Sequence, residues 1–318
     1  MLKRFLVPLD GTPHAENALR CAAALAARTG AHITLLHVVE ASAPTTVHGE
    51  RHLAKPCDAM DYLASAAARH LPPGVPFDTH VHPEPSPHVA ASIAAHDVEF
   101  RCDLIVISPH GPWNWKTWIS GSVPQRVAKK IDTPVLVVRD FPESSGRPLF
   151  GSILIPDDAS EIHEGAWEIC FDFSKACHSD VRLLCVVETP QTLGGPGAAT
   201  ATFLPKATGL VLALAEETAR AHIDAHLRLF AERGIAASGE VRRGDPFATL
   251  CDVSRKNQSD LVVLRSHRRA GLTAWIEGSL TSRFLAETGS SVLILPTSGQ
   301  SHLSPPVGTA PAIPQRSS

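Results

Sequence analysis

The chain has 318 residues, of which 44% are hydrophobic and 19% charged, and its formal net charge is −3. These values are typical of a globular protein and exclude a disordered chain, which combines low hydrophobicity with high net charge. At about 150 residues per domain the length predicts two domains, and the lack of a basic excess argues against a nucleic-acid partner.

Strand and helix signals alternate along the first half of the chain. Residues 14–28 carry alanines and leucines at helical spacing, and Gly30 follows where such a helix would stop. The predicted strands of this half are 4–8, 32–38, 77–82, 103–107 and 134–138.

No apolar run approaches the ~18 residues that cross a bilayer, and the start lacks the apolar stretch of a secretory signal. We therefore expect a cytoplasmic protein without a membrane partner.

The second half repeats the first. RFLVPLDGT at 4–12 is similar to SILIPDDAS at 152–160, and GSVPQRVAKKIDTPVLVV at 121–138 is similar to GSLTSRFLAETGSSVLIL at 278–295. The chain is therefore a tandem duplication. The strands predicted for the second half are 152–156, 181–187, 237–243, 260–264 and 291–296.

These repeats define the predicted domains. We divide the chain into a first domain at 1–143, a second domain at 148–298 and a disordered tail at 299–318, which holds many prolines and little to bury. Within the second domain, the Gly- and Ala-rich residues 188–208 are expected to form a mobile connection before a long helix at 209–232.

The strands are apolar throughout, as in LIVI, VLVV and LVVL. Such runs indicate burial on both faces, which is typical of a parallel sheet covered by helices. With right-handed crossovers, the pattern predicts an α/β fold of two tandem doubly wound five-stranded parallel-sheet domains.

Ligands of open α/β sheets bind beyond the carboxyl ends of the strands, where the strand order reverses. Asp10 follows the first strand, and its carboxylate can accept hydrogen bonds from sugar hydroxyls or a base amine. The loop after the fourth strand carries Gly111, Gly121 and Ser122. Glycine lets a phosphate approach the backbone, and the free N–H groups where Gly121-Ser122 open a helix favour an anion. An ordinary helix cap is the alternative, since the P-loop Lys and a G-x-G-x-x-G motif are absent.

These motifs resemble those of tandem universal stress proteins, the UspA superfamily, over about residues 3–298. PLDGT, DLIVI, Gly111, Gly121-Ser122 and TPVLVV stand in the places of that family's motifs. The resemblance implies an adenine nucleotide alpha hydrolase-like fold and a stress-response protein that binds ATP or AMP, with Mg²⁺ accompanying ATP. Because family members pair their last strands about a two-fold axis, TPVLVV and SSVLIL are expected to pair within the chain as a pseudo-dimer, with a homodimer as a further expectation.

The resemblance also implies roles for residues of the first half. Asp10 would contact the base or ribose, and Val38 would line the adenine pocket. Ser108 and Gly111 would meet the ribose and the first phosphates, although the family has glycine at the first of these positions. Gly121 and Ser122 would hold the outer phosphates.

The corresponding site of the second half departs further from the family pattern. Long side chains, Arg265 and Arg268, stand where the backbone should meet phosphate, and only Gly278-Ser279 is retained. Asp158 occupies the position of Asp10. We expect either a degenerate site here or an altered site that holds an anion by charge.

Two functions remain open at the level of the sequence. In the first, an adenine nucleotide bound in the N-terminal repeat changes the surface that an unknown protein partner recognises, so that the protein acts as a sensor or regulator. In the second, the protein is a scaffold that binds no nucleotide, which the loss of glycine at Ser108, Arg265 and Arg268 favours. We assign no catalytic residue, because a hydrolase triad and G-x-S-x-G are missing, and a weak ATPase is the most that we expect of an enzyme.

Histidines, cysteines and tryptophans give weaker signals. His80 and His82 share one face of a predicted strand and His88 follows, but a metal would need a third well-placed ligand. We therefore assign no metal site and expect solvent-facing histidines. The seven cysteines form no CxxC and are expected to be small buried hydrophobes. Trp113 and Trp115, in the proposed phosphate loop, are expected either to pack or to form a lid or partner contact.

Overall fold

The protein is described here from a computed structural model. The structure describes residues 2–41, 46–47, 50–51, 53, 55–109, 123–128, 130–139, 141, 148–157, 164–193, 196–265 and 279–296. None of the helices in these ranges is long and apolar enough to cross a membrane.

The first half alternates strands and helices as predicted. Helix α1 begins after Thr12, whose hydroxyl accepts a hydrogen bond from the Ala15 amide (3.2 Å), and it ends at Gly30, whose φ of 68° suits a residue without a Cβ. The elements of this half are β1 (Arg4–Pro8), α1 (Pro13–Thr29), β2 (His32–Glu40), β3 (Thr46–Val47), β4 (Glu50–Arg51), α2 (Pro56–His70), β5 (Phe77–Ser86), α3 (Val89–Phe100), β6 (Leu104–Ile107), α5 (Val123–Ala128) and β7 (Val135–Val137).

The second half repeats this alternation with one addition. Its elements are β8 (Ser152–Pro156), α6 (Glu164–Cys177), β9 (Asp180–Val187), α7 (Pro196–Phe203), α8 (Pro205–Glu232), β10 (Ala237–Arg243), α9 (Pro246–Lys256), β11 (Leu261–Arg265), α10 (Ser279–Thr288) and β12 (Ser291–Leu295). The prediction that residues 188–208 only connect a strand to a helix at 209–232 is wrong in part, because α7 and the start of α8 lie within them. Alanine favours helix strongly, and a proline stands in the first turn of each helix, where its missing N–H costs nothing.

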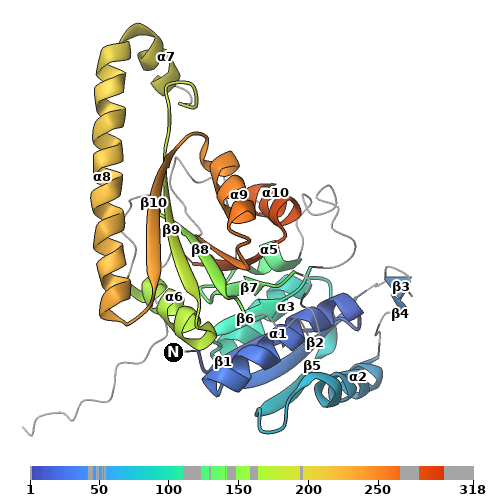
Figure 1. The fold of residues 1–318 in the computed structure, drawn as a ribbon. Helices are drawn as coiled ribbons and strands as arrows, with labels where there is room; N and C mark the ends of the chain where they lie inside the picture. Colours follow the sequence, from blue (N-terminus) through green and yellow to red (C-terminus); the bar gives the residue numbers. More distant parts are fainter. Residues whose placement is uncertain are drawn as a thin grey trace, which may run out of the picture.

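One ten-stranded sheet runs through the whole molecule (Figure 1), in the order β10-β9-β8-β11-β12-β7-β6-β1-β2-β5. The five strands of each half are parallel to one another. The halves meet where β12 pairs antiparallel with β7, with Leu293 opposite Leu136. The order is therefore symmetric about this β7–β12 seam, and both the doubly wound fold and the expected pairing of the last strands are confirmed.

Helices cover both faces of the sheet. Residues of α1, α2, α6 and α8 form a core on one face, and residues of α3, α5, α9 and α10 form a core on the other. Successive strand residues point alternately into the two cores: Phe5 and Val7 lie in the first and Leu6 in the second. Burial on both faces is the reason that these strands are apolar throughout.

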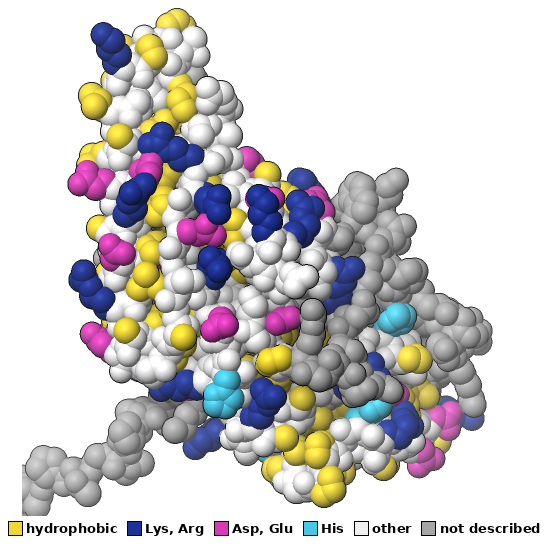
Figure 2. Space-filling model, in the orientation of Figure 1, with side chains coloured by type: hydrophobic (Ala, Val, Ile, Leu, Met, Phe, Trp, Pro, Cys, Tyr) yellow, Lys and Arg dark blue, Asp and Glu magenta, His cyan; other side chains and the backbone are white. Residues whose placement is uncertain are grey.

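The addition in the second half forms an arm. Ile33 and Phe77 are partners across β2 and β5 and lie 44 residues apart, whereas Val181 and Ala237, their counterparts across β9 and β10, lie 56 apart. The extra residues form α7 and lengthen α8, which project together beyond the ends of β9 and β10 (Figure 1). Hydrophobic side chains appear on the surface of this arm (Figure 2); the exposed ones are Phe203, Leu204, Leu210, Val211 and Leu214.

Candidate functional site

The strand order of the first half reverses at β1, which has β2 on one side and β6 on the other. A ligand crevice is expected beyond the carboxyl ends of strands at such a reversal. Asp10 lies just after β1 and Ser108 directly after β6, so the fold brings these two predicted residues to the same edge of the sheet. Val38 lies near the end of β2, the third strand at this edge.

The carboxylate of Asp10 is held by the turn that leads into α1. Its Oδ1 accepts hydrogen bonds from the Thr12 amide (3.0 Å) and from the Thr12 hydroxyl (2.8 Å), and the same hydroxyl caps α1. Gly11 between them has φ 94°, and an added Cβ would approach Leu53 Cδ1 to 2.9 Å. The turn therefore requires glycine, and it fixes the orientation of the half-buried Asp10.

The buried His37 connects this turn to β2. Its Nδ1 lies 2.8 Å from the carbonyl oxygen of Leu9, and its Nε2 lies 3.2 Å from the carbonyl oxygen of Leu53. The amide of Leu9 also donates to the carbonyl of Leu36 (2.8 Å). The backbone at the end of β1 is thus fixed from two sides, while Val38 is 8% exposed and packs in the second core.

Ser108 is buried, and its hydroxyl donates a hydrogen bond to the carbonyl oxygen of Val138 (3.1 Å). This bond runs across from the end of β6 to the end of β7. A glycine at this position, as in the family pattern, would leave that carbonyl without this donor. The serine therefore has a role within the sheet edge, independent of any ligand.

The other predicted site residues divide into two groups. In the second half, Arg265 is the last residue of β11 and Ser279 the first of α10. The remaining positions fall outside the described residues: Gly111, Gly121, Ser122, Asp158, Arg268 and Gly278, together with Trp113 and Trp115.

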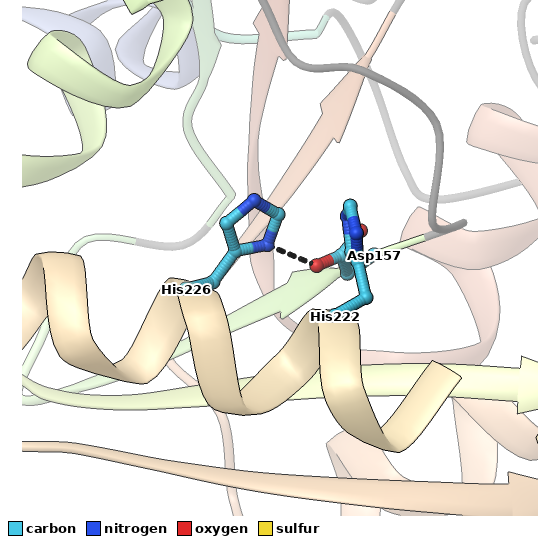
Figure 3. A group of neighbouring side chains, drawn as sticks. All are labelled: Asp157, His222 and His226. Carbon is cyan, nitrogen blue, oxygen red and sulfur yellow. Dashed lines mark hydrogen bonds and ion pairs between the residues drawn. The ribbon is translucent and has the colours of Figure 1, made fainter. Parts of the chain in front are cut away.

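A polar cluster that sequence reasoning missed lies at the end of β8. His226 Nδ1 and Asp157 Oδ2 are 2.5 Å apart, and His222 Nε2 lies 3.4 Å from Asp157 Oδ1. Figure 3 shows both imidazoles rising from one face of α8 toward the carboxylate. The available signal was two histidines four residues apart in the predicted helix 209–232, but nothing in the sequence linked them to the acidic pair after the strand.

Three histidines also meet in the first half. The third is His96 of α3, not His88, and it lies with its Nε2 3.1 Å from His82 Nδ1. The rings of His80 and His96 are 4.6 Å apart. The expectation of solvent-facing side chains at His80 and His82 is wrong, because both are half-buried against α3. His88 is exposed, as expected.

These features define a tandem doubly wound α/β protein with a candidate ligand crevice at the strand-order reversal of its first half. The chain belongs to the Universal stress protein family, whose sequence profile matches residues 1–139 and 150–296. Both halves of the chain are thus members of one family, in agreement with the internal repeat.

Individual relatives agree with this assignment. The chain is 26% identical over 291 residues to universal stress protein Rv2623 of Mycobacterium tuberculosis, an alignment that covers 86% of this chain and 90% of that protein. It is 29% identical over 153 residues to universal stress protein Sll1654 of Synechocystis, which covers 48% of this chain and 90% of that one. A solved universal stress protein from Archaeoglobus fulgidus has the same fold, with a TM-score of 0.61 at 14% identity over 93% of this chain and 97% of that chain.

Proposed function

We propose that the first half binds an adenine nucleotide, ATP or AMP, in the crevice beyond β1 and β6, and that the protein acts as a sensor or regulator in a stress response. One observation carries this proposal: Asp10 and Ser108 end neighbouring strands at the strand-order reversal, with Val38 at the end of the next strand. Nucleotides bind at such reversals because the strand ends and the following helix starts present N–H groups there.

Each residue has a role in the proposed complex. Asp10 contacts the base or ribose, and Val38 lines the adenine pocket. Ser108 and Gly111 meet the ribose and the first phosphates. Gly121 and Ser122 then hold the outer phosphates, with Mg²⁺ accompanying ATP. No residue is given a catalytic role, and weak ATP hydrolysis is the most that we expect.

The second half is proposed to differ in its ligand. Arg265 ends β11 where the family pattern has glycine, and Arg268 and Gly278-Ser279 follow in the sequence. A long side chain there leaves less room for a nucleotide phosphate to reach the protein backbone. We therefore propose a degenerate site, with an anion held by charge as the alternative. The domain limits 1–143 and 148–298, a cytoplasmic location, an unidentified protein partner and a homodimer stay predictions.

Binding of ATP and of AMP to three proteins tests the nucleotide proposal. Gly121→Val adds a side chain where the outer phosphates are proposed to approach, and Gly278→Val makes the same change at the equivalent position of the second half. We expect calorimetric titration to give tight binding for the wild type and for Gly278→Val, and much weaker binding of ATP for Gly121→Val. Equal ATP affinity in all three proteins would refute the site.

A scaffold that binds no nucleotide is the second candidate. The hydrogen bond from the Ser108 hydroxyl to Val138 favours it, because it gives the serine a purpose that needs no ligand. Mass spectrometry of small molecules released from the purified protein separates the two functions. Co-purified nucleotide supports the sensor. An empty protein whose thermal unfolding temperature does not change with ATP supports the scaffold.

A further inference from the structure

The cluster of Asp157, His222 and His226 occupies a position that is apolar in the first half. The amide of Asp157 donates to the carbonyl of Leu184, just as the amide of Leu9 donates to the carbonyl of Leu36, both at 2.8 Å. Asp157 is therefore the counterpart of Leu9, a core residue that is 3% exposed.

The two histidines have counterparts on α2. The buried residues Ala59, Leu63 and Ala66 of α2 have the same spacing as the buried residues Ala219, Ile223 and His226 of α8. His226 therefore corresponds to Ala66 and His222 to Tyr62. The same framework thus folds with leucine, tyrosine and alanine in the first half, so the fold itself does not require three ligating side chains in the second half.

One buried nitrogen of this cluster, Nε2 of His222, lacks a hydrogen bond among the described residues. The side chain of Asp157 is fully buried and that of His226 is 11% exposed. The Nε2 of His222 is buried as well and forms no hydrogen bond with any described residue. A buried polar atom left without a hydrogen bond destabilises a fold by about 1–3 kcal/mol. Such an atom facing a buried carboxylate is what a metal ion would satisfy.

The geometry and the ligand types suit zinc. The three candidate ligand atoms lie within 4.8 Å of one another. Two ligands at the usual ~2.1 Å from a tetrahedral ion lie about 3.4 Å apart, which equals the distance from His222 Nε2 to Asp157 Oδ1. Two histidines four residues apart on one helix face are a common pair of zinc ligands.

We propose that Asp157, His222 and His226 bind a divalent transition-metal ion of the zinc type. The ion takes the place of the proton between His226 Nδ1 and Asp157 Oδ2, which lie 2.5 Å apart and must separate to about 3.4 Å when both ligate the ion. The described residues supply three of the four ligands that zinc usually takes. The ion joins the C-terminal half of α8 to the end of β8. The indole of Trp167, whose ring centroid lies 4.5 Å from that of His226, holds the imidazole in place.

The three histidines of the first half provide the internal control. His80, His82 and His96 also lie close together, but the carboxylate beside them, Glu99, contacts His96 from an exposed position. Removing His80 from this group should leave the proposed metal site intact.

Cobalt titration of protein stripped with a chelator tests the proposal, because cobalt in a tetrahedral site absorbs visible light strongly and replaces zinc readily. We compare the wild type with His222→Gln, Asp157→Asn and the control His80→Gln, without added nucleotide. His222 is the least buried of the three ligands, so its variant is expected to fold, which circular dichroism checks.

We expect one tetrahedral cobalt ion per chain for the wild type and for His80→Gln, and displacement of cobalt by zinc. Loss of an outer-shell partner lowers metal affinity roughly 10–100-fold. Both ligand variants remove a direct ligand, so their affinity for cobalt should fall by more than this. Zinc should also raise the thermal unfolding temperature of the wild type and of the control, but not of His222→Gln. Binding that is equal in wild type and His222→Gln, or that is lost only in His80→Gln, would overturn the proposal.

Discussion

His80 shows how the environment of a single side chain departs from what its sequence neighbours suggest. It lies on β5, with His82 on the same face, and both contact His96, whose Nδ1 lies 2.8 Å from Glu99 Oε2. Burial, and after it the neighbouring His96, lowers the pKa of His80 below its ordinary value of 6.5. The ring of Phe100, 5.2 Å away, contributes to this apolar contact.

The lowered pKa of His80 predicts acid sensitivity. Because the unfolded chain binds this proton more tightly than the folded protein, protonation favours unfolding. Above pH 6.5 the imidazole is neutral in both states, and stability is lost as the pH falls from 6.5 toward the lower folded pKa. We expect His80→Gln to reduce the loss, as measured by urea denaturation across this range. Replacing the exposed His14 with Gln serves as the control, and equal slopes for both variants would contradict the prediction.

The cysteines show how far the burial of single side chains can be predicted from residue type. Five of the seven are buried, as expected for small hydrophobic residues, and Cys102 is partly so. Burial raises the pKa of the thiols of Cys170, Cys177 and Cys251 to about 12, which leaves them protonated at neutral pH. The expectation is wrong for Cys57, which is exposed because it lies in the first turn of α2 on the side away from the sheet.

At the scale of elements, the packing of α8 on β10 depends on a glycine. A Cβ at Gly239 would overlap Cγ2 of Ile223 and come within 3.3 Å of Leu227 Cδ1. Both neighbours lie on α8, so the helix must move away or the side chains must leave their rotamers. The side chains of α8 therefore pack directly against the backbone of β10 at Gly239, which any larger residue would prevent.

We predict that Gly239→Ala lowers the free energy of unfolding by about 1–3 kcal/mol, the usual cost of overpacking. Gly209, within α8, has no atom within 4 Å of its missing Cβ. Gly209→Ala should therefore stabilise the protein by about 0.5–1 kcal/mol, because alanine favours helix over glycine. Denaturant titration measures both, and a Gly239→Ala variant that is as stable as the wild type or more so would show that the contact with Ile223 is unimportant.

The strands were predictable because an unbroken apolar run such as Leu104–Ile107 is typical of a strand in a sheet that helices cover on both faces. Helix α7 was not, because a Gly- and Pro-containing stretch is typical of loops unless a neighbour such as α8 gives it something to pack on. The position of the candidate crevice and Asp10 followed from the strand ends, whereas Ser108 was predicted from the family resemblance. The pairing of Asp157 with His226 spans 69 residues and depends on how α8 crosses the sheet, which no local pattern encodes.

At the scale of the whole molecule, the two halves share their interior. Each of the two cores contains residues of both halves, and the sheet is continuous through the β7–β12 seam. Arg139, after β7, adds contacts across this seam: its amide donates to the Ser291 hydroxyl (3.2 Å) and its Nη1 to the carbonyl of Leu285 (3.1 Å). The two repeats of this chain are therefore joined by one continuous sheet and two shared cores.

This architecture predicts that the halves unfold together. Leu136 and Leu293 face each other across the seam, and both are fully buried. Replacing both with alanine removes packing contacts between the two halves. Each substitution should lower the free energy of unfolding by about 2–5 kcal/mol. Calorimetry of the wild type should give one transition whose calorimetric and van't Hoff enthalpies agree. In the seam variant the calorimetric enthalpy should exceed the van't Hoff enthalpy, because the halves begin to unfold separately.

A matched variant separates coupling from stability. Leu35 of β2 and Leu63 of α2 are also fully buried, but β2 pairs with β1 and β5, and α2 packs on β2 and β5, all within the first half. Replacing both with alanine should cost a similar amount of stability, and it should weaken the first half without removing a contact of the seam. If this variant and the seam variant give the same ratio of enthalpies, the seam does not couple the halves. Two separate transitions in the wild type would show that the continuous sheet joins two independent domains, because the shared core would then contribute too little to hold them together.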